Sequence, residues 1–399
     1  MVPGPLMSTR PSPTAPRPDL LDAVRALAPA IRARGDEIER GRRVPLELVH
    51  GLADAGAFRM CVPRALGGGE VTVRTLVDVI EEVARADGSA GWIVMIGATS
   101  GLVSGYMPAD VAAEIYGPPD AVTGGVFAPR GEAVPVDGGF RARGRWAFGS
   151  GSEHCGWLLG GCMVLDDGKP RLVGRGIPDS RMMLFPASDV RILDTWDVAG
   201  LRGTGSHDFE VADVFVPAAR AVSLITDRPR ADGPLFRFPV FGLLALGIAA
   251  VATGIARTAI DELVALAGGK TPTGSRRLLA ERPVVQAQVA QAEAALQTSR
   301  AWLHATIAEA WATAERGVAI PVAERAALRL AATEATARAA RAVDLMYEAG
   351  GGTSIYAGSL LQRCFRDVHV ATQHAMVAPS TYELTGRLLL GLETDSAML

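Results

Sequence analysis

Residues 238–255 read FPVFGLLALGIAAVATGI and contain no charged residue. The stretch reaches the lower limit of length for crossing a bilayer, so a membrane span is one interpretation. It is rich in Ala and Gly, however, and Arg257, Asp261 and Glu262 follow it at once. A helix that is apolar on every side is also typical of the centre of a large helical bundle. We therefore predict a buried central helix here rather than a membrane span.

Long helices are predicted throughout the second half of the chain. Ala-rich segments cover residues 241–267, 282–315, 320–349 and 358–391, with short breaks such as AGGKTPTG and EAGGGTS between them. Four long helices joined by short connections describe a helix bundle. We predict this C-terminal four-helix bundle over residues 233–399.

The first half of the chain has different residue patterns, which divide it into two regions. Within residues 121–232, alternating runs such as FRARGRWAF and GWLLGGCMVL are separated by Gly and Pro, which indicates a central β domain. Residues 19–120 are predicted to form an N-terminal helical domain, because apolar residues recur at helical spacing from Leu20 to Ile31. The Pro-rich residues 1–18 are predicted to be a disordered leader. The expected fold class is α+β, mostly α.

Composition excludes several classes of function. The formal net charge of −3 argues against a nucleic-acid partner, which would require a basic surface. The four cysteines show no CxxC spacing, so we expect reduced thiols. His154 beside Cys155 is a candidate metal pair, but no second pair stands at ligand spacing, and we expect no metal. The N-terminal segment lacks the apolar stretch of a signal peptide, which favours a cytoplasmic protein.

The tract GRWAFGSGSEHCGW, residues 144–157, is the first candidate for a functional site. It places the aromatic residues Trp146 and Phe148 beside Ser150 at the end of a predicted strand. A flat flavin ring requires an aromatic wall and a hydrogen bond near its reactive N5. Phe148 and Ser150 are two residues apart, so a regular strand would present them to the same side. An aromatic strand that simply turns at a Gly-Ser loop is the structural alternative.

Two further tracts carry unusual residues. TWDVAGLRGTGSHDFEVADVFVP, residues 195–217, is followed by strand character rather than a helix, so it is no phosphate loop, and a tight β-turn explains it locally. Residues 347–377 read YEAGGGTSIYAGSLLQRCFRDVHVATQHAMV. Their glycines would let a ligand approach the backbone closely. His369 and His374 follow in a predicted helix, either as core residues or as catalytic groups.

In this order the tracts resemble the acyl-CoA dehydrogenase superfamily. ADGSAGW, GRWAFGSGSEHCGW, GLRGTGS–VFVP and LLQRCFRDVH are more specifically similar to its flavin-dependent monooxygenase branch, the oxygenase components of two-component hydroxylases. The resemblance covers about residues 20 to 392. It implies an acyl-CoA dehydrogenase-like fold, a homotetramer, and a flavin bound between the β domain and the bundle with a neighbouring subunit contributing.

The resemblance also implies the cofactor and its contacts. Reduced FMN or FAD would come from a separate flavin reductase, because no NAD(P)H-binding fingerprint is present, and O2 would be the second substrate. Ser150 would face N5 of the flavin. The residues expected around the rest of the cofactor are Trp146, Phe148, Gly351, Gly352, and Arg277 or its neighbour Arg276 as a phosphate partner.

The segment RDVHVATQHA distinguishes between two reactions in this superfamily. Many of its dehydrogenases carry a catalytic Glu eight positions after the Asp of an Arg-Asp pair, and here Ala375 stands eight positions after Asp367. Some members place the Glu on the first bundle helix instead, but residues 238–255 contain no carboxylate. The resemblance therefore implies a monooxygenase that inserts one oxygen atom through a flavin C4a-hydroperoxide, with Ser150 and His374 as catalytic residues. The ordinary histidine pKa near 6.5 would suit proton transfer by His374. An acyl-CoA dehydrogenase-type flavoprotein with an unusual base is the alternative.

The residues near the expected substrate differ from those of the branch's phenol hydroxylases. These enzymes often have a His about seven residues after the Trp of the DGSxGW motif, whereas Thr99 or Ser100 stands near that place here. TGGVFAP, residues 123–129, replaces their Ser-rich strand. We therefore expect a small hydrophobic, aromatic or amine substrate, such as a polycyclic aromatic, an indole or a sulfur heterocycle, rather than a simple phenol.

Overall fold

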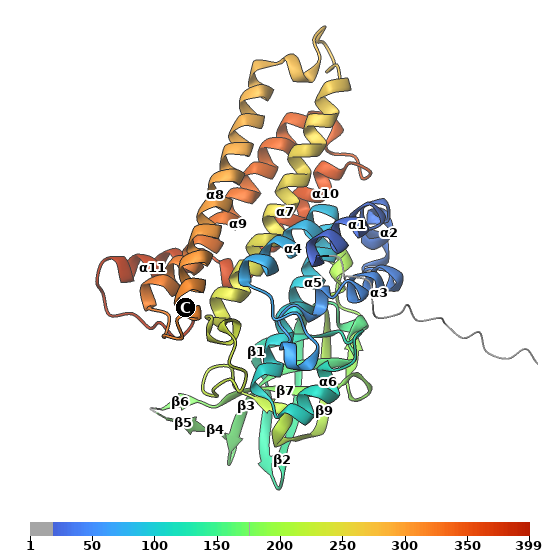
Figure 1. Cartoon of the computed structure of the whole chain (residues 1–399). Coiled ribbons are helices and arrows are strands. Elements are labelled where there is room, and N and C mark those ends of the chain that lie inside the picture. The colour runs from blue at the N-terminus through green and yellow to red at the C-terminus, as the bar shows by residue number, and fades with distance from the viewer. Residues whose placement is uncertain (1–18, 175) are drawn as a thin grey trace, which may run out of the picture.

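The computed structural model of the chain describes residues 19–174 and 176–399, and the predicted leader, residues 1–18, lies outside this range. A sheet forms the lower part of the molecule in Figure 1, and a bundle of long helices rises above it. The N-terminal helices lie against the side of the bundle and above the sheet. The order of helices, strands and helices is the predicted one. The exact domain limits stay a prediction.

Six α-helices precede the sheet. They are α1 (Leu20–Ala33), α2 (Gly35–Gly41), α3 (Leu46–Asp54), α4 (Val73–Ala86), α5 (Gly88–Ser100) and α6 (Ala109–Tyr116). Asp87 ends α4 and begins α5, because its carboxylate accepts a hydrogen bond from the Ala90 N–H at 3.0 Å and so caps the new helix. This junction fixes the direction of α5, which carries residues toward the sheet.

The central sheet has eight strands, and all its pairings are antiparallel except that of β1 with β3. The strand order is β10-β7-β3-β1-β2-β9-β8, with β4 paired to β3. The main strands are β1 (Thr123–Val136), β2 (Gly139–Gly149), β3 (Trp157–Asp166), β7 (Ser180–Pro186) and β9 (His207–Pro217), and the shorter ones are β4 (Lys169–Pro170), β8 (Arg191–Leu193) and β10 (Ala221–Val222). A separate hairpin joins β5 (Leu172–Val173) to β6 (Ile177–Pro178).

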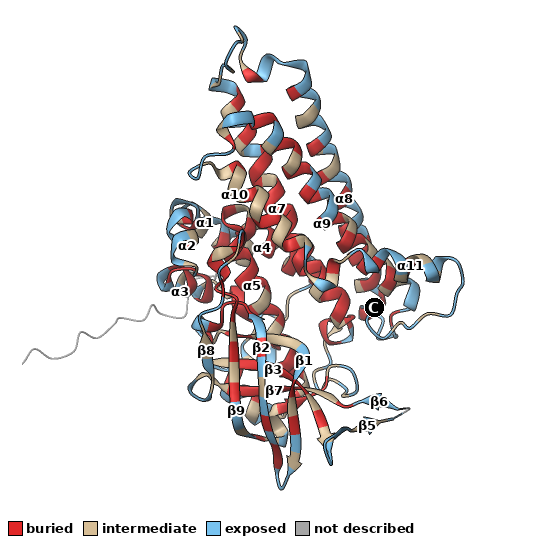
Figure 2. Cartoon of the chain, turned by 180° about the vertical axis from the view of Figure 1, so that it is seen from behind, coloured by how far each residue is buried: buried red, intermediate tan, exposed pale blue. Residues whose placement is uncertain are grey.

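The bundle is built around α7 (Val240–Gly269), the apolar helix predicted from the sequence. It packs with α8 (Pro283–Glu315), α9 (Val322–Gly350), α10 (Leu360–Thr372) and the N-terminal helices α4 and α5. Length and composition would allow α7 to cross a membrane, but 83% of its most apolar window is buried inside the protein. Figure 2 shows this burial along the helix. The prediction of a buried central helix is confirmed.

The prediction of one long fourth helix over residues 358–391 is wrong. The chain leaves the helix after α10, forms a 3-10 turn, η11 (Ala375–Val377), and starts again as α11 (Ser380–Leu389). The break begins at His374, which is extended with ψ 132°. Pro379, which lacks an N–H and disfavours helical geometry at Ala378, then separates the 3-10 turn from α11. His374 lies at this break.

Candidate active site

Ser150 lies just beyond the end of β2 and is buried, with 5% of its surface exposed. The indole N–H of Trp92, on α5, donates to Ser150 Oγ at 3.1 Å. Ser150 Oγ also lies 2.6 Å from Ser206 Oγ, in the loop before β9. A helix, a strand end and a loop therefore meet at this one hydroxyl group.

The direction of the hydrogen bonds around Ser150 follows from counting protons. The Thr204 hydroxyl donates to the Leu201 carbonyl at 2.8 Å, and Thr204 Oγ1 lies 2.7 Å from Ser206 Oγ. Each hydroxyl has one proton, so Ser206 donates to Thr204, and Ser150 in turn donates to Ser206. We call this chain of Ser150, Ser206, Thr204 and the Leu201 carbonyl the hydroxyl relay. In this arrangement the hydroxyl proton of Ser150 is donated to Ser206, and one of its two lone pairs accepts the Trp92 N–H. The second lone pair is left to accept a hydrogen bond from a ligand.

Phe148 lies in a local irregularity of β2. The register between β2 and β9 shifts between Trp146 and Gly149, and Phe148 has φ +68°, an uncommon value for a residue with a side chain. Its ring is 69% exposed and meets the ring of Trp196 edge-on at 6.2 Å. The regular alternation that we assumed for Phe148 and Ser150 therefore does not hold, since one is exposed and the other buried.

Trp146 requires a correction. Its side chain is fully buried within the sheet, stacked on Phe209 with ring centroids 5.1 Å apart, and its N–H donates to the Gly161 carbonyl at 2.7 Å. Both the ring and the N–H are therefore occupied by the core. The structure gives Trp146 no surface for a cofactor, and we remove it from the predicted contacts.

His374 lies at the break between α10 and α11. Its Nδ1 accepts a hydrogen bond from the Met376 N–H at 3.2 Å, so in the neutral ring the proton is on Nε2. Burial, with the nearby guanidinium of Arg329, lowers the pKa of His374 to about 4. The assumption of an ordinary pKa near 6.5 is therefore wrong. At neutral pH this ring is uncharged and donates through Nε2–H.

Trp92 connects His374 to Ser150 and was not predicted as a site residue. Its ring centroid lies 5.8 Å from that of His374 with a tilt of 59°, while its N–H reaches Ser150. Trp92 is 7% exposed, so one indole ring fixes both side chains. The ADGSAGW motif contained the signal, but nothing in the sequence indicated its two partners.

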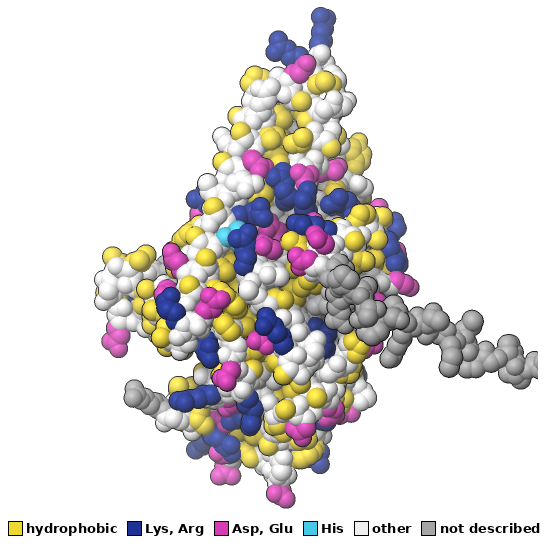
Figure 3. Space-filling model, viewed as in Figure 1, with side chains coloured by type: hydrophobic (Ala, Val, Ile, Leu, Met, Phe, Trp, Pro, Cys, Tyr) yellow, Lys and Arg dark blue, Asp and Glu magenta, His cyan; other side chains and the backbone are white. Residues whose placement is uncertain are grey.

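The remaining predicted contacts lie elsewhere. Arg277 is exposed in the connection between α7 and α8, and Gly351 and Gly352 follow α9. Lys270 Nζ donates to the Gly350 carbonyl at 2.6 Å, which ties this glycine loop to the end of α7. Figure 1 places these segments at the tip of the bundle, opposite the sheet, and Figure 3 shows basic side chains at that tip. Within one chain they do not meet Ser150.

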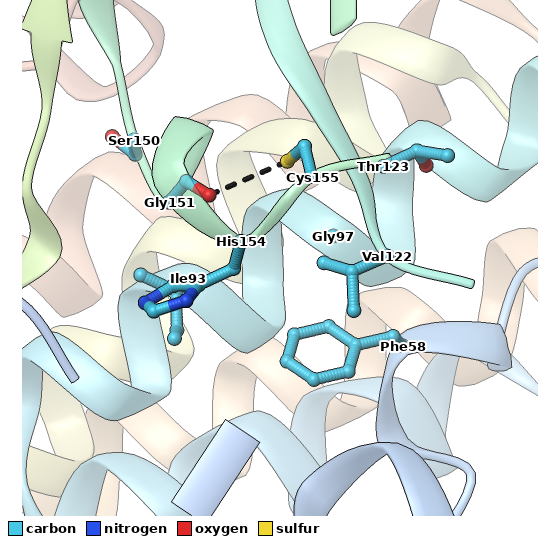
Figure 4. Close-up of a pocket in the computed structure, with 9 residues that line it drawn as sticks. All are labelled: Phe58, Ile93, Gly97, Val122, Thr123, Ser150, Gly151, His154 and Cys155. Carbon is cyan, nitrogen blue, oxygen red and sulfur yellow. Dashed lines mark hydrogen bonds between the residues drawn. The ribbon is translucent and has the colours of Figure 1, made fainter. Parts of the chain in front are cut away.

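A small cavity lies beneath Ser150 (Figure 4). It has a volume of about 10 Å³ and is lined by Phe58, Ile93, Gly97, Val122, Thr123, Ser150, Gly151, His154 and Cys155. That space accommodates about one water molecule, so it is no substrate pocket. The Cys155 thiol donates to the Gly151 carbonyl at 3.3 Å, and burial raises its pKa to about 12. A protonated thiol is a poor metal ligand, which argues against a metal site at His154 and Cys155.

Within the described ranges, one other group of side chains has the spacing of a metal site: Asp78, Glu81 and His304. Arg300 lies 2.9 Å from Glu81, and Arg74 lies 2.7 Å from Asp78. These two guanidinium groups already balance the carboxylates, so the group is explained as an ion-pair network between α4 and α8.

The residues around Ser150 fit a reduced flavin. Phe148 offers an exposed aromatic face, and Ser150 offers a lone pair for the N–H that reduced flavin carries at N5. Ser152, two residues on, has a buried Oγ that forms no hydrogen bond within the described part of the chain. A polar ligand at this edge would satisfy such an atom, which is otherwise costly to bury.

Comparisons with known proteins identify the family of this chain. The family models described as acyl-CoA dehydrogenase N-terminal and C-terminal domains match residues 17–110 and 246–379. An indole-3-acetate monooxygenase of Pseudomonas putida is 37% identical over 93% of this chain and 92% of that protein. The flavin-dependent monooxygenase oxygenase subunit HsaA of Rhodococcus jostii is 29% identical over 94% of this chain and 99% of that protein. The solved structure of XiaF from Streptomyces sp., in complex with FADH2 and glycerol, has a TM-score of 0.86 at 27% identity, covering 94% of this chain and 96% of that one.

Proposed function

The chain belongs to the acyl-CoA dehydrogenase family and is an oxygenase component among its flavin-dependent monooxygenases, and from this premise we propose that its substrate is a fused aromatic compound of the indole type. It uses reduced flavin and O2, and a separate flavin reductase is its functional partner. One observation carries the site proposal: Trp92 contacts both Ser150 and His374. Ser150 then acts on the flavin side and His374 on the substrate side.

Each residue has a distinct role in this proposal. The bound reduced flavin supplies the activation of O2. Ser150 would accept a hydrogen bond from the N5–H of reduced flavin and so hold that proton in place, and Phe148 would pack against the ring. His374 donates from Nε2–H to the substrate or to the oxygen being transferred. Its low pKa keeps it from acting as a cationic acid at neutral pH.

The substrate class is argued from the polar groups that are already occupied. Thr99 Oγ1 donates to the Met95 carbonyl at 2.8 Å, and Ser100 Oγ donates to the Gly97 carbonyl at 2.8 Å. Neither hydroxyl proton remains for a phenol oxygen. Nearby, β1 and α7 bring Phe127 and Phe241 together edge-on at 5.3 Å, which adds apolar surface. The similarity to an indole-3-acetate monooxygenase supports the same class.

We also propose a cytoplasmic homotetramer in which two chains complete each flavin site. Ser150 and Phe148 lie at the end of β2, whereas Arg277 lies in the connection between α7 and α8, and Gly351 and Gly352 follow α9. Figure 1 shows β2 in the sheet and the connection between α7 and α8 at the far end of the bundle. A flavin that contacts both groups requires a second chain. An open groove of about 540 Å³ between α8 and α9, lined in part by the half-exposed Trp302, offers a surface for that chain.

The alternative, an acyl-CoA dehydrogenase, is not favoured. Ala375 occupies the position of the usual base, and the neighbouring His374 has a pKa of about 4. Ala375 itself has no group that could accept a proton, so α,β-dehydrogenation lacks the carboxylate that many dehydrogenases of the family use.

The test combines the purified protein with a flavin reductase, NADH, FMN or FAD, and ¹⁸O2. Indole-3-acetate is compared with indole, phenol and resorcinol by mass spectrometry. We expect one labelled oxygen atom in the indole substrates and little or none in the simple phenols. Labelled phenol products without labelled indole products would overturn the substrate class. Anaerobic bleaching of the flavin by an acyl-CoA would instead support the dehydrogenase.

A further inference from the structure

Asp367, on α10, is a buried carboxylate to which the roles above assign nothing. It is 6% exposed, and its Oδ1 accepts a hydrogen bond from the Leu201 N–H at 2.6 Å. Burial raises its pKa to about 7, so holding a carboxylate in this place works against its ordinary ionisation. A buried carboxylate with a raised pKa is unfavourable by itself, so we ask what its hydrogen bond to the Leu201 N–H does for the site.

Leu201 has an uncommon backbone conformation and ends the hydroxyl relay. Its φ of +49° and ψ of 35° lie in the left-handed region, which a residue with a side chain adopts only when its surroundings fix it. Its carbonyl accepts hydrogen bonds from Thr204 Oγ1 at 2.8 Å and from Trp196 Nε1 at 3.2 Å. The direction of that carbonyl therefore sets the direction of the relay, and Trp196 is the ring that meets Phe148.

The segment around Leu201 rests directly on α10. A Cβ atom added to Gly200 would lie 2.3 Å from the Arg366 carbonyl oxygen, so only glycine allows this approach. Arg366 also donates a hydrogen bond to the Ala199 carbonyl. Arg366 and Asp367 of α10 thus contact the three consecutive residues 199–201, the last of which carries the carbonyl that ends the relay.

We propose that Asp367 is a positioning residue for the flavin site: by holding the Leu201 N–H, it orients the carbonyl that ends the relay and so keeps Ser150 as an acceptor toward N5. This inference rests on the proposed flavin contact of Ser150. The same helix ends two residues before His374, so α10 lies next to both the proposed substrate side and the proposed flavin side.

The test measures the preference of the protein for reduced over oxidised flavin. Reduced flavin carries N5–H and gains from an acceptor at Ser150, whereas the unprotonated N5 of oxidised flavin does not. Anaerobic titration of the purified full-length protein with FMN in both redox states gives the dissociation constant for each. The preference for reduced FMN is the dissociation constant of oxidised FMN divided by that of reduced FMN. A hydrogen bond worth about 1 kcal/mol corresponds to about a fivefold change in this ratio.

We expect Asp367→Ala and Ser150→Ala each to lower the preference for reduced FMN about fivefold. The double variant should show no further loss, because Asp367 acts through Ser150. Asp367→Asn should keep most of the preference, since its amide oxygen still accepts the Leu201 N–H. The control is Asp344→Asn, which removes a carboxylate from α9 where it contacts His369 at 2.9 Å, away from the relay. It should behave as the wild type.

The outcomes separate this inference from the proposed function. An unchanged ratio in Ser150→Ala would reject the flavin contact itself. A changed ratio in Ser150→Ala with an unchanged ratio in Asp367→Ala, or with additive losses in the double variant, would overturn only the role of Asp367. If Asp367→Ala does not fold, Thr204→Val interrupts the relay with a residue of similar shape. It should lower the ratio as Ser150→Ala does, and an unchanged ratio would overturn the proposal.

Discussion

Replacing His374 with Asn should make the protein less sensitive to acid. The pKa of His374 is lowered to about 4, mainly by burial, so the folded protein disfavours the protonated ring. Its contribution to stability is fully present above the ordinary histidine pKa of 6.5 and is lost as the pH falls toward 4. Asn keeps an oxygen that can accept the Met376 N–H, and it removes the titrating group.

The size of the effect follows from the two pKa values. Each tenfold difference in proton affinity between the folded and unfolded states is worth about 1.4 kcal/mol. At pH 5 the unfolded imidazole is almost fully protonated and the folded one is mostly neutral. Protonating the unfolded ring therefore removes about 2 kcal/mol from the free energy of unfolding of the wild type, compared with pH 7.5.

The assay is urea unfolding at pH 7.5 and pH 5.0, at one protein concentration, followed by tryptophan fluorescence. Carboxylates titrate in both proteins, so both lose some free energy of unfolding between pH 7.5 and pH 5.0. The informative quantity is the difference between the loss in the wild type and the loss in His374→Asn. The wild type should lose about 2 kcal/mol more than His374→Asn. The exposed His50 on α3 supplies a control, His50→Asn, for the substitution itself. Equal losses in the wild type and His374→Asn would refute the buried, neutral state of His374.

Four further predictions concern the flavin site. Ser150→Ala should raise the share of O2 released as hydrogen peroxide, measured against oxygenated product, and unchanged coupling would contradict its role at N5. Trp92→Phe keeps a ring beside His374 but loses the N–H donor, so it should lower stability by about 1 kcal/mol in urea unfolding and partly uncouple the reaction. Phe148→Ala should change the stability of the apoprotein by less than about 0.5 kcal/mol, because the ring is 69% exposed, yet weaken flavin binding up to about tenfold by titration. Co-expression of Ser150→Ala with Arg277→Gln should restore coupled turnover above that of either variant alone, because mixed assemblies of the proposed homotetramer would contain sites with both native residues; no recovery would argue against a shared site.

The sequence predicted the types of element well and the geometry of the site poorly. Alternating runs and helical spacing report which face of a long element is buried, which is why the sheet and α7 were predicted. Phe148 shows the limit of that reasoning. One irregular residue with a positive φ changes the side to which its neighbours point, and no residue pattern signals it. Trp146 and Phe148 therefore have opposite exposure, although both looked suitable for a flavin wall.

The hydroxyl relay was missed for a different reason. Thr204 and Ser206 lie in GLRGTGS, which reads locally as a turn and is one. Their function depends on partners supplied by the end of β2, by α5 and by α10, and these are far apart in the sequence. Such contacts are properties of the assembled fold. Local patterns locate the segments, and tertiary packing alone determines which atoms meet.

The segment RDVHVATQHA has a more specific meaning in the structure than in the sequence. Where a dehydrogenase of this family has its base, this chain has Ala375 at the start of a 3-10 turn, after α10 has ended at Thr372 and His374 has taken an extended conformation with ψ 132°. The break turns the preceding His374 so that its Nδ1 caps the turn and its ring meets Trp92. The result is an uncharged, partly buried donor rather than a carboxylate base. A neutral donor could stabilise an oxygen atom during its transfer, and Ala375 offers no group to take a proton from carbon. We therefore propose that the segment that lacks the dehydrogenase base presents His374 as the donor for oxygen transfer.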